Sequence, residues 1–274
     1  MPASSKRSRR IKARENDYKQ TGVMRKAKRN ALDTKNETDE ASAKIAKKRF
    51  NPHDLASVSL KNLNQERFVQ LYYDDTPLLL ATGWPGTAKS FLSIYCALSE
   101  VFDDSTPYDK LIIVRSAVET RSVGFLPGTL EEKSFYFESP YRALFSEIMP
   151  QFKEGYDHCK SLGYVEFMLT THIRGLSLHN CIVLVEEAQN MDIGELRSVL
   201  TRAGLNTRIL INGDSFQDDL QRKREKSGLG DLKRIFEKMP ASYFGHIHYD
   251  KEDIVRSGLV KEFVIADFEL NGSN

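Results

Sequence analysis

One octapeptide limits the folds available to this chain more than any other feature. Its sequence is Gly83-Trp84-Pro85-Gly86-Thr87-Ala88-Lys89-Ser90. The apolar run 77–82 before it predicts a buried strand, and the apolar-rich segment 91–98 after it predicts a helix. A strand, a Gly-rich turn, a Lys-Ser pair and a helix, in this order, form the pattern of a phosphate-binding P-loop. The octapeptide therefore predicts an α/β fold built around a nucleotide site.

The chemistry of such a loop assigns a role to each part of the octapeptide. Backbone N–H groups from Gly83 to Ser90 would surround the phosphates, helped by the positive end of the helix. Lys89 would reach the outer phosphates and the Ser90 hydroxyl would ligate Mg²⁺, so ATP and Mg²⁺ are the expected cofactors. Position 88 is Ala, where the usual pattern has Gly. Because Ala adds only a methyl group and favours helix, we expect nucleotide binding to survive this change.

Apolar, β-branched runs alternate with helical patterns along the rest of the chain, which predicts a doubly wound, mainly parallel sheet with helices on both faces. The predicted strands are 78–82, 110–115, 165–169, 181–186, 208–213 and 243–249. The predicted helices are 90–102, 129–149 with a break near Pro140, 192–203 and 227–239.

Charge divides the 274 residues into two parts. Residues 1–50 carry 16 Lys or Arg against 6 Asp or Glu, whereas residues 51–274 carry 24 against 32. The first part is too polar to form a core, which predicts a disordered basic tail followed by one globular domain over 51–274. The tail is either a solvated segment or an arm that binds nucleic-acid phosphates.

Composition also limits location and metal chemistry. No membrane-length apolar run and no secretory signal occur, so the expected location is the cytoplasm, without a membrane partner. Cys96 and Cys181 lie in apolar runs and are expected to be reduced core residues. His246 and His248 share one face of a predicted strand, but without a third ligand a structural role is favoured over metal binding.

A second motif places two carboxylates at the end of the predicted strand 181–186. Glu186 and Glu187 follow the apolar sequence Cys-Ile-Val-Leu-Val. In P-loop ATPases a strand beside the P-loop strand ends in an acid that holds the Mg²⁺ shell, and the next acid polarises water. We therefore predict that Glu186 serves Mg²⁺ and that Glu187 is the general base. The competing interpretation is a solvated acidic turn.

Two further segments point to the same edge of the sheet. The predicted strand 208–213 ends at Asp214, and Gln217 follows three residues later. At the carboxyl end of a parallel strand, Asp214 and Gln217 would lie beside the γ-phosphate. Upstream of the octapeptide, Gln65 is a candidate for hydrogen bonding to an adenine edge, or else an ordinary residue at a helix start.

Together these motifs resemble the PhoH-like family of P-loop ATPases, which are related to superfamily-1 helicases. The resemblance covers about 64–266. Its further motifs are Val114-Arg115-Ser116-Ala117-Val118-Glu119, Gly124-Phe125-Leu126-Pro127-Gly128, Ile173-Arg174-Gly175, Glu187-Ala188-Gln189-Asn190, Leu200-Thr201-Arg202, Gly213-Asp214 with Gln217, Lys226-Ser227-Gly228-Leu229 and Asp253-Ile254-Val255-Arg256. This sequence departs from the family at Ala88, Ser116 and Glu186, which leaves ATP binding expected and the rate of hydrolysis open.

The resemblance implies a single RecA-like P-loop NTPase domain, ATPase activity, RNA or single-stranded DNA as partner, and the helicase activity proposed for the family. A chain with one lobe lacks the arginine that a second lobe supplies, so a neighbouring copy would donate it. This predicts a homo-oligomer, at least a dimer or a ring such as a hexamer. The candidate arginines are Arg256, Arg202 and Arg174. A lone domain with a short tail is similar to phage-encoded members, whose location would be the host cytoplasm.

Basic and aromatic side chains between Arg115 and Pro140 are candidates for nucleic-acid contact, because aromatic rings stack on single-stranded bases. They are Arg115, Arg121, Phe125, Lys133, Phe135, Tyr136 and Phe137. The competing interpretation, equally favoured, is that Phe125 and Phe135 are core residues. Two functions compete with an ATP-driven remodelling enzyme. One is a nucleotide-dependent nucleic-acid-binding switch with little hydrolysis. The other is a small-molecule kinase, against which Glu187 and the Gly213-Asp214 strand argue.

Overall fold

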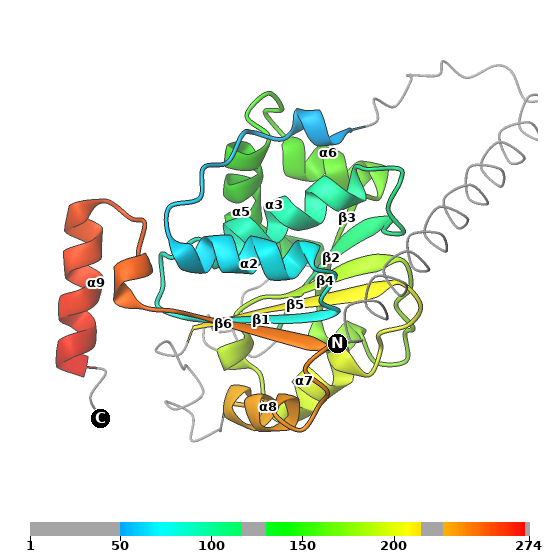
Figure 1. Cartoon of the computed structure of the whole chain (residues 1–274). Helices are drawn as coiled ribbons and strands as arrows, with labels where there is room; N and C mark the ends of the chain where they lie inside the picture. The colour runs from blue at the N-terminus through cyan, green and yellow to red at the C-terminus, as the bar shows by residue number, and fades with distance from the viewer. Residues whose placement is uncertain (1–49, 117–129, 215–226, 272–274) are drawn as a thin grey trace, which may run out of the picture.

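Helices cover both faces of one twisted sheet in the computed structural model of this chain (Figure 1). The model describes residues 50–116, 130–214 and 227–271. The predicted tail over 1–50 lies outside the described residues except for Phe50, which is buried. Phe50 packs against the rings of Phe102 and Phe152, so this residue belongs to the apolar core.

The sheet has six strands, all parallel where they pair, in the order β3-β2-β4-β5-β1-β6. They are β1 (Leu78–Gly83), β2 (Lys110–Arg115), β3 (Val165–Leu169), β4 (Cys181–Val185), β5 (Thr207–Asp214) and β6 (Phe244–Tyr249). Each predicted strand is confirmed to within one residue at either end. Every residue of β1 and β4 is buried, as expected for strands covered on both faces.

Seven α-helices lie in the described part of the chain. They are α2 (Leu63–Tyr73), α3 (Lys89–Val101), α5 (Leu130–Ile148), α6 (Gly155–Leu162), α7 (Ile193–Leu200), α8 (Leu229–Phe236) and α9 (Gly258–Asn271). Helices α2, α3, α5 and α6 cover one face of the sheet and α7 and α8 cover the other, whereas α9 stands beside the strands (Figure 1). Short 3-10 turns are η1 (Pro52–Asp54), η2 (Thr170–His172), η3 (Ala188–Asn190) and η5 (Lys251–Asp253).

The two helical layers give two apolar cores, one on each face of the sheet. The larger contains Phe68, Leu98 and Phe145, and the smaller contains Leu196 and Leu232. Local signals set the helix starts: the Asp192 side chain accepts from Glu195 N at 2.8 Å in a capping box that begins α7. None of the helices within the described ranges is long and apolar enough to cross a membrane.

The structure corrects two expectations. Strand β4 does not lie beside the P-loop strand β1, because β5 pairs with both and separates them. The sequence could not show this, since strand order depends on pairing between distant segments. The predicted break at Pro140 is also wrong, because α5 continues through it. Pro140 is exposed, so water can bind the carbonyl that loses its helical partner.

Candidate functional site

Strand β1 ends in a turn that favours glycine at two positions. Gly83 has φ 118°, and a Cβ atom there would lie 2.0 Å from the carbonyl oxygen of Tyr249. Gly86 has φ 74°, and a Cβ atom there would lie 2.8 Å from Cγ of Arg256. The loop therefore turns tightly between β1 and α3, with its backbone free of side chains at these points.

The backbone conformation of Ala88 differs from the helical one that we expected. Ala88 is not helical: it has φ 69° and ψ 24°, in the left-handed region, and it caps the start of α3. Such a conformation costs an L-residue about 1–2 kcal/mol relative to the right-handed one. The usual Gly at this position thus avoids backbone strain as well as a methyl group near phosphate.

The Lys89 side chain folds back onto its own loop. Its Nζ donates to the carbonyl oxygens of Trp84 at 2.6 Å and Gly83 at 3.2 Å. Burial lowers the pKa of Lys89, and the nearby carboxylates of Asp214, Glu186 and Glu187 oppose this shift. The cation is therefore held at the loop by weak neutral acceptors, which an anionic ligand would replace.

Ser90 and Glu186 meet although 96 residues separate them. The Ser90 hydroxyl donates to Glu186 Oε2 at 2.8 Å, and Asn212 Nδ2 donates to Oε1 at 2.8 Å. Glu186 is only 3% exposed. Burial, with a further contribution from Glu187, raises the pKa of Glu186 to about 7, against the hydrogen bonds from Asn212 and Ser90. The predicted Mg²⁺ residues thus lie together as a pair of oxygen donors.

Glu187 turns away from the strand in a left-handed conformation, with φ 54° and ψ 43°. A non-glycine residue held there stores backbone strain of about 1–3 kcal/mol, which is typical of functional sites. Its Oε2 accepts from Gln189 Nε2 at 2.5 Å. The turn after β4 therefore brings both carboxylates to the same edge of the sheet, as expected.

Asp214 reaches this edge from β5. It pairs in register with Gly83, the first residue of the loop. Its backbone N–H donates to Gln189 Oε1 at 2.8 Å, so Gln189 connects Asp214 to Glu187. Gln217 lies outside the described residues, and its role remains a prediction.

Gln65 contacts the loop from behind. It is 3% exposed, and its Nε2 donates to the carbonyl oxygen of Thr87 at 3.2 Å while its Oε1 accepts from Lys61 N at 2.8 Å. These bonds tie the start of α2 to the P-loop. Contact with an adenine edge stays a prediction.

The three candidate arginines lie in different places. Arg256 packs on Gly86 of its own P-loop. Arg202 follows α7, where its carbonyl oxygen accepts from Leu178 N, at the edge of the sheet where β4 begins. Arg174 is exposed in the turn after η2. Within one chain, therefore, Arg256 is the one of these three arginines that contacts the phosphate loop.

Only part of the segment 115–140, which we predicted to contact nucleic acid, lies within the described residues. Phe135 and Tyr136 of α5 are 56% and 64% exposed, and the Arg142 guanidinium lies 4.4 Å from the centre of the Phe135 ring. Phe137 is buried, with Arg115 5.9 Å from its ring centre. Arg121 and Phe125 lie outside the described residues, as does the side chain of Lys133.

Sequence reasoning missed Asn212 and Gln189 as site residues. Both are buried amides that hold the carboxylates, and Asn212 also accepts from Ser93 Oγ at 3.2 Å. A polar residue inside the apolar run of β5 was the signal for Asn212. The signal for Gln189 was its place two residues after Glu187.

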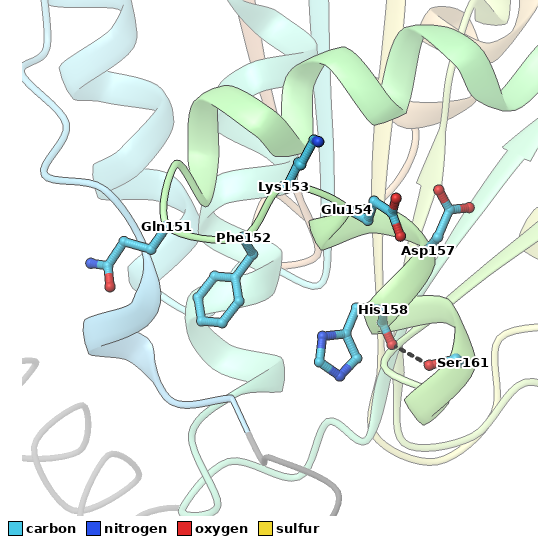
Figure 2. Close-up of a pocket in the computed structure, with 7 residues that line it drawn as sticks. All are labelled: Gln151, Phe152, Lys153, Glu154, Asp157, His158 and Ser161. Carbon is cyan, nitrogen blue, oxygen red and sulfur yellow. Dashed lines mark hydrogen bonds between the residues drawn. The ribbon is translucent and has the colours of Figure 1, made fainter.

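A shallow pocket of about 490 Å³ lies elsewhere, along α6 and the segment that joins α5 to α6 (Figure 2). It is lined by Gln151, Phe152, Lys153, Glu154, Asp157, His158 and Ser161, and contains no P-loop residue. The described residues hold no cluster of three or more His, Cys, Asp or Glu side chains that could bind a metal ion. His246 and His248 both hydrogen bond to Thr82 Oγ1, at 2.8 and 3.2 Å. The three cysteines are free and buried, including Cys96 and Cys181 as expected.

The parallel sheet, with the loop and its acids at the carboxyl ends of β1, β4 and β5, defines a RecA-like P-loop NTPase domain. The chain belongs to the PhoH family: the family model described as PhoH-like protein matches residues 57–267.

Relatives agree with this assignment. The PhoH-like protein of Synechocystis is 32% identical over 239 residues, 86% of this chain and 70% of its own length. Protein PhoH of Escherichia coli K12 is 32% identical over 203 residues, 72% of this chain and 56% of its length. The Bacillus subtilis PhoH-like protein is 30% identical over 214 residues, 77% of this chain and 64% of its length. This chain thus spans little more than half of the Escherichia coli protein.

Among solved structures, the large terminase from a thermophilic bacteriophage aligns with a TM-score of 0.44 and 12% identity. The alignment covers 73% of this chain and 48% of the terminase. A likeness this remote carries no argument about function.

Proposed function

We propose that this chain binds ATP with Mg²⁺ at the P-loop and hydrolyses it. The observation that carries the proposal is the meeting of Lys89, Ser90, Glu186 and Glu187 at one edge of the sheet. A buried carboxylate 2.8 Å from a hydroxyl offers the oxygen donors that Mg²⁺ prefers. Ser90 and Glu186 would hold Mg²⁺ there, and the ion would supply positive charge to offset that of the phosphates.

In this mechanism each side chain has one task. Lys89 leaves the loop carbonyls and binds the outer phosphates, where its charge stabilises the transition state. Ser90 and Glu186 hold the metal shell. Glu187 takes a proton from the attacking water, which requires its carboxylate to be ionised. Asp214 and Gln217 orient groups beside the γ-phosphate.

We further propose RNA or single-stranded DNA as the partner and a homo-oligomer in the cytoplasm as the working form. The exposed pair Phe135 and Tyr136 supports a base-stacking role, because two rings side by side meet solvent at 56% and 64% exposure. Arg142, held by Asp157 through bonds of 2.9 and 3.0 Å, adds a positioned cation next to Phe135. The basic segment 1–50 would add phosphate contacts without sequence preference. Helicase activity is a further step that these features do not require.

The test is phosphate release with and without single-stranded RNA or DNA, alongside a mass measurement in solution. We expect stimulation by single strands, and loss of activity in Lys89→Ala. The matched control is Lys153→Ala, which removes an exposed lysine from the pocket along α6. Full activity in Lys89→Ala would refute the proposal.

The second candidate is a nucleotide-dependent switch with little hydrolysis. The raised pKa of Glu186 favours it, because a protonated carboxyl group is a poor ligand for Mg²⁺. Tight ATP binding without turnover, in the presence of single strands, would select this candidate. Phosphate transfer to a small molecule would instead identify a kinase.

A further inference from the structure

A segment from the end of the chain packs against the P-loop. It follows β6 and comprises η5, residues 254–257 and α9; we call residues 250–271 the collar. Val255 N donates to the carbonyl oxygen of Gly86 at 3.0 Å, which joins the collar to the loop by a backbone bond. Figure 1 shows η5 and α9 beside the sheet, next to β6.

Two more contacts fix the collar on its own chain. Before Val255, the buried Asp253 accepts from Asn64 Nδ2 at 2.7 Å through Oδ2, and from Asn62 Nδ2 at 3.2 Å through its carbonyl oxygen. After it, the Phe268 ring of α9 lies 4.4 Å from the Trp84 ring, centre to centre, at 64°. The collar is therefore held on both sides of residue 256 by the same chain.

Arg256 is the residue that this arrangement places over the loop. Its Cγ is so close to Gly86 that a Cβ atom there would lie 2.8 Å away, and its Nε would lie 3.7 Å from the same point. The side chain is exposed, and it forms no ion pair with a carboxylate of the described residues. An unneutralised guanidinium at the rim of a phosphate-binding loop is suited to bidentate binding of phosphate oxygens.

We propose that Arg256 binds the phosphates of the nucleotide in its own subunit, so that this contact needs no neighbouring copy. The proposal rests on the ATPase function proposed above and specifies its arginine. Since Val255 is bonded to Gly86, residue 256 stays within one peptide unit of that anchor, about 3.8 Å between Cα atoms. The packing of its Cγ and Nε beside Gly86 directs this side chain along the loop of its own subunit.

The first test measures affinity, at a protein concentration where mass measurement finds monomers. Arg256→Met keeps the aliphatic packing on Gly86 and removes the charge. We expect it to weaken binding of Mg²⁺ with a non-hydrolysable ATP analogue by roughly 10- to 100-fold, the loss of one charged hydrogen bond. Arg256→Lys should recover part of the loss, and Lys251→Ala, an exposed cation on the same collar, should bind as the unchanged protein does. Unchanged affinity in Arg256→Met would overturn the proposal.

The second test mixes Lys89→Ala, which should be inactive, with Arg256→Met in equal amounts, at an ATP concentration too low to saturate Arg256→Met. If Arg256 acts within its own subunit, no mixed assembly contains a complete site, and the rate stays at the mean of the two separate variants. If it acts across an interface, random mixing restores about a quarter of the activity; this outcome overturns the proposal. Failure of Lys89→Ala to lose activity would instead overturn the ATPase function itself, so the two failures are distinguishable.

Discussion

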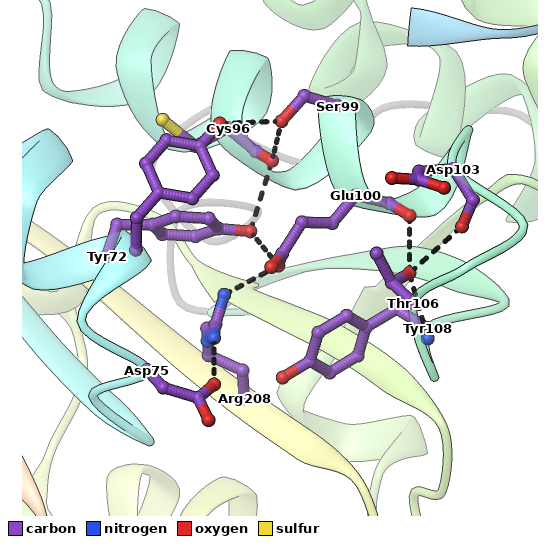
Figure 3. A network of polar contacts seen from close by, with 10 residues as sticks. Tyr72, Asp75, Cys96, Ser99, Glu100, Asp103, Thr106, Tyr108 and Arg208 are labelled. Carbon is purple, nitrogen blue, oxygen red and sulfur yellow. Dashed lines mark hydrogen bonds and ion pairs between the residues drawn. The ribbon is translucent and has the colours of Figure 1, made fainter. Parts of the chain in front are cut away.

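Two groups of charged side chains, one around the buried Arg208 and one around the buried Glu186, lie at opposite ends of β5 and differ in what balances their charges. At the start of the strand, Arg208 is 2% exposed and pairs with Glu100 at 2.5 Å and Asp75 at 2.7 Å (Figure 3). The rings of Tyr72 and Tyr108 lie 4.4 and 5.2 Å from its guanidinium carbon. Each charge in this group faces an opposite charge on the same chain.

At the other end of β5 the charged side chains of the described residues do not form such ion pairs with one another. Glu186 lies near Glu187, and its pKa rises to about 7. Lys89 binds loop carbonyls, and two residues of the site, Ala88 and Glu187, hold left-handed backbone. One group therefore stabilises the fold, whereas the other keeps strain and unbalanced charge that a ligand would relieve.

The largest expected effect is on catalysis. Glu187→Gln should lower kcat by roughly 10²–10⁴-fold, because the amide cannot take a proton from water, while ATP affinity changes little. Steady-state hydrolysis and analogue binding measure the two quantities. Gln151→Glu, at the distant pocket, is a control for altered surface charge. Full kcat in Glu187→Gln would show that the strained turn serves some other purpose.

Removing the Arg208 cation at the start of β5 should lower the stability of the fold. Arg208→Met leaves Glu100 buried without its partner, so the free energy of unfolding should fall by about 3–5 kcal/mol. Urea titration measures it, and the double variant Arg208→Met with Glu100→Gln should recover part of the loss. Equal stability of Arg208→Met and the unchanged chain would break the contrast between the two groups.

Glu186→Gln should have the opposite effect on stability in the ligand-free chain. The folded state keeps the Glu186 proton up to about pH 7, whereas the unfolded state loses it near 4.5. Between these values the folded state binds more protons, so the free energy of unfolding falls as pH rises and levels off above pH 7. At pH 8 Glu186→Gln should therefore be more stable by about 2–3 kcal/mol, and below pH 4.5 by little.

The same variant should lose Mg²⁺-dependent nucleotide affinity, which would separate stability from function at one residue. Denaturant titrations at pH 4 and pH 8 measure the first quantity, and calorimetry with and without Mg²⁺ measures the second. A stability gain that is equal at both pH values would mean that packing, rather than charge, decides the effect.

The smallest effect concerns the loop backbone. Ala88→Gly should relieve the left-handed strain, offset by the greater freedom of Gly in the unfolded chain, for a net stabilisation of about 0.5–1 kcal/mol. Thermal unfolding measures it, with Ala97→Gly inside α3 as a control that should destabilise. A loss of stability in Ala88→Gly would contradict the strained conformation.

The sequence predicted those parts of the fold that depend on neighbours along the chain. The strands were found because continuous apolar runs such as 181–185 are buried on both faces, and the loop was found because its glycines stand between a strand and a helix. The family followed from the same local motifs. Helix α9 was not predicted, because it has no clear polar face: Leu259, Phe263 and Leu270 are all exposed.

Only the tertiary structure decided which distant residues complete the site. It placed β5 between β1 and β4, set Asn212 and Gln189 behind the two carboxylates, and laid Arg256 over Gly86. These contacts join segments up to 170 residues apart. They depend on the pairing of strands and the return path of the chain, which no local pattern encodes, whereas the presence of a phosphate loop could be predicted from eight consecutive residues.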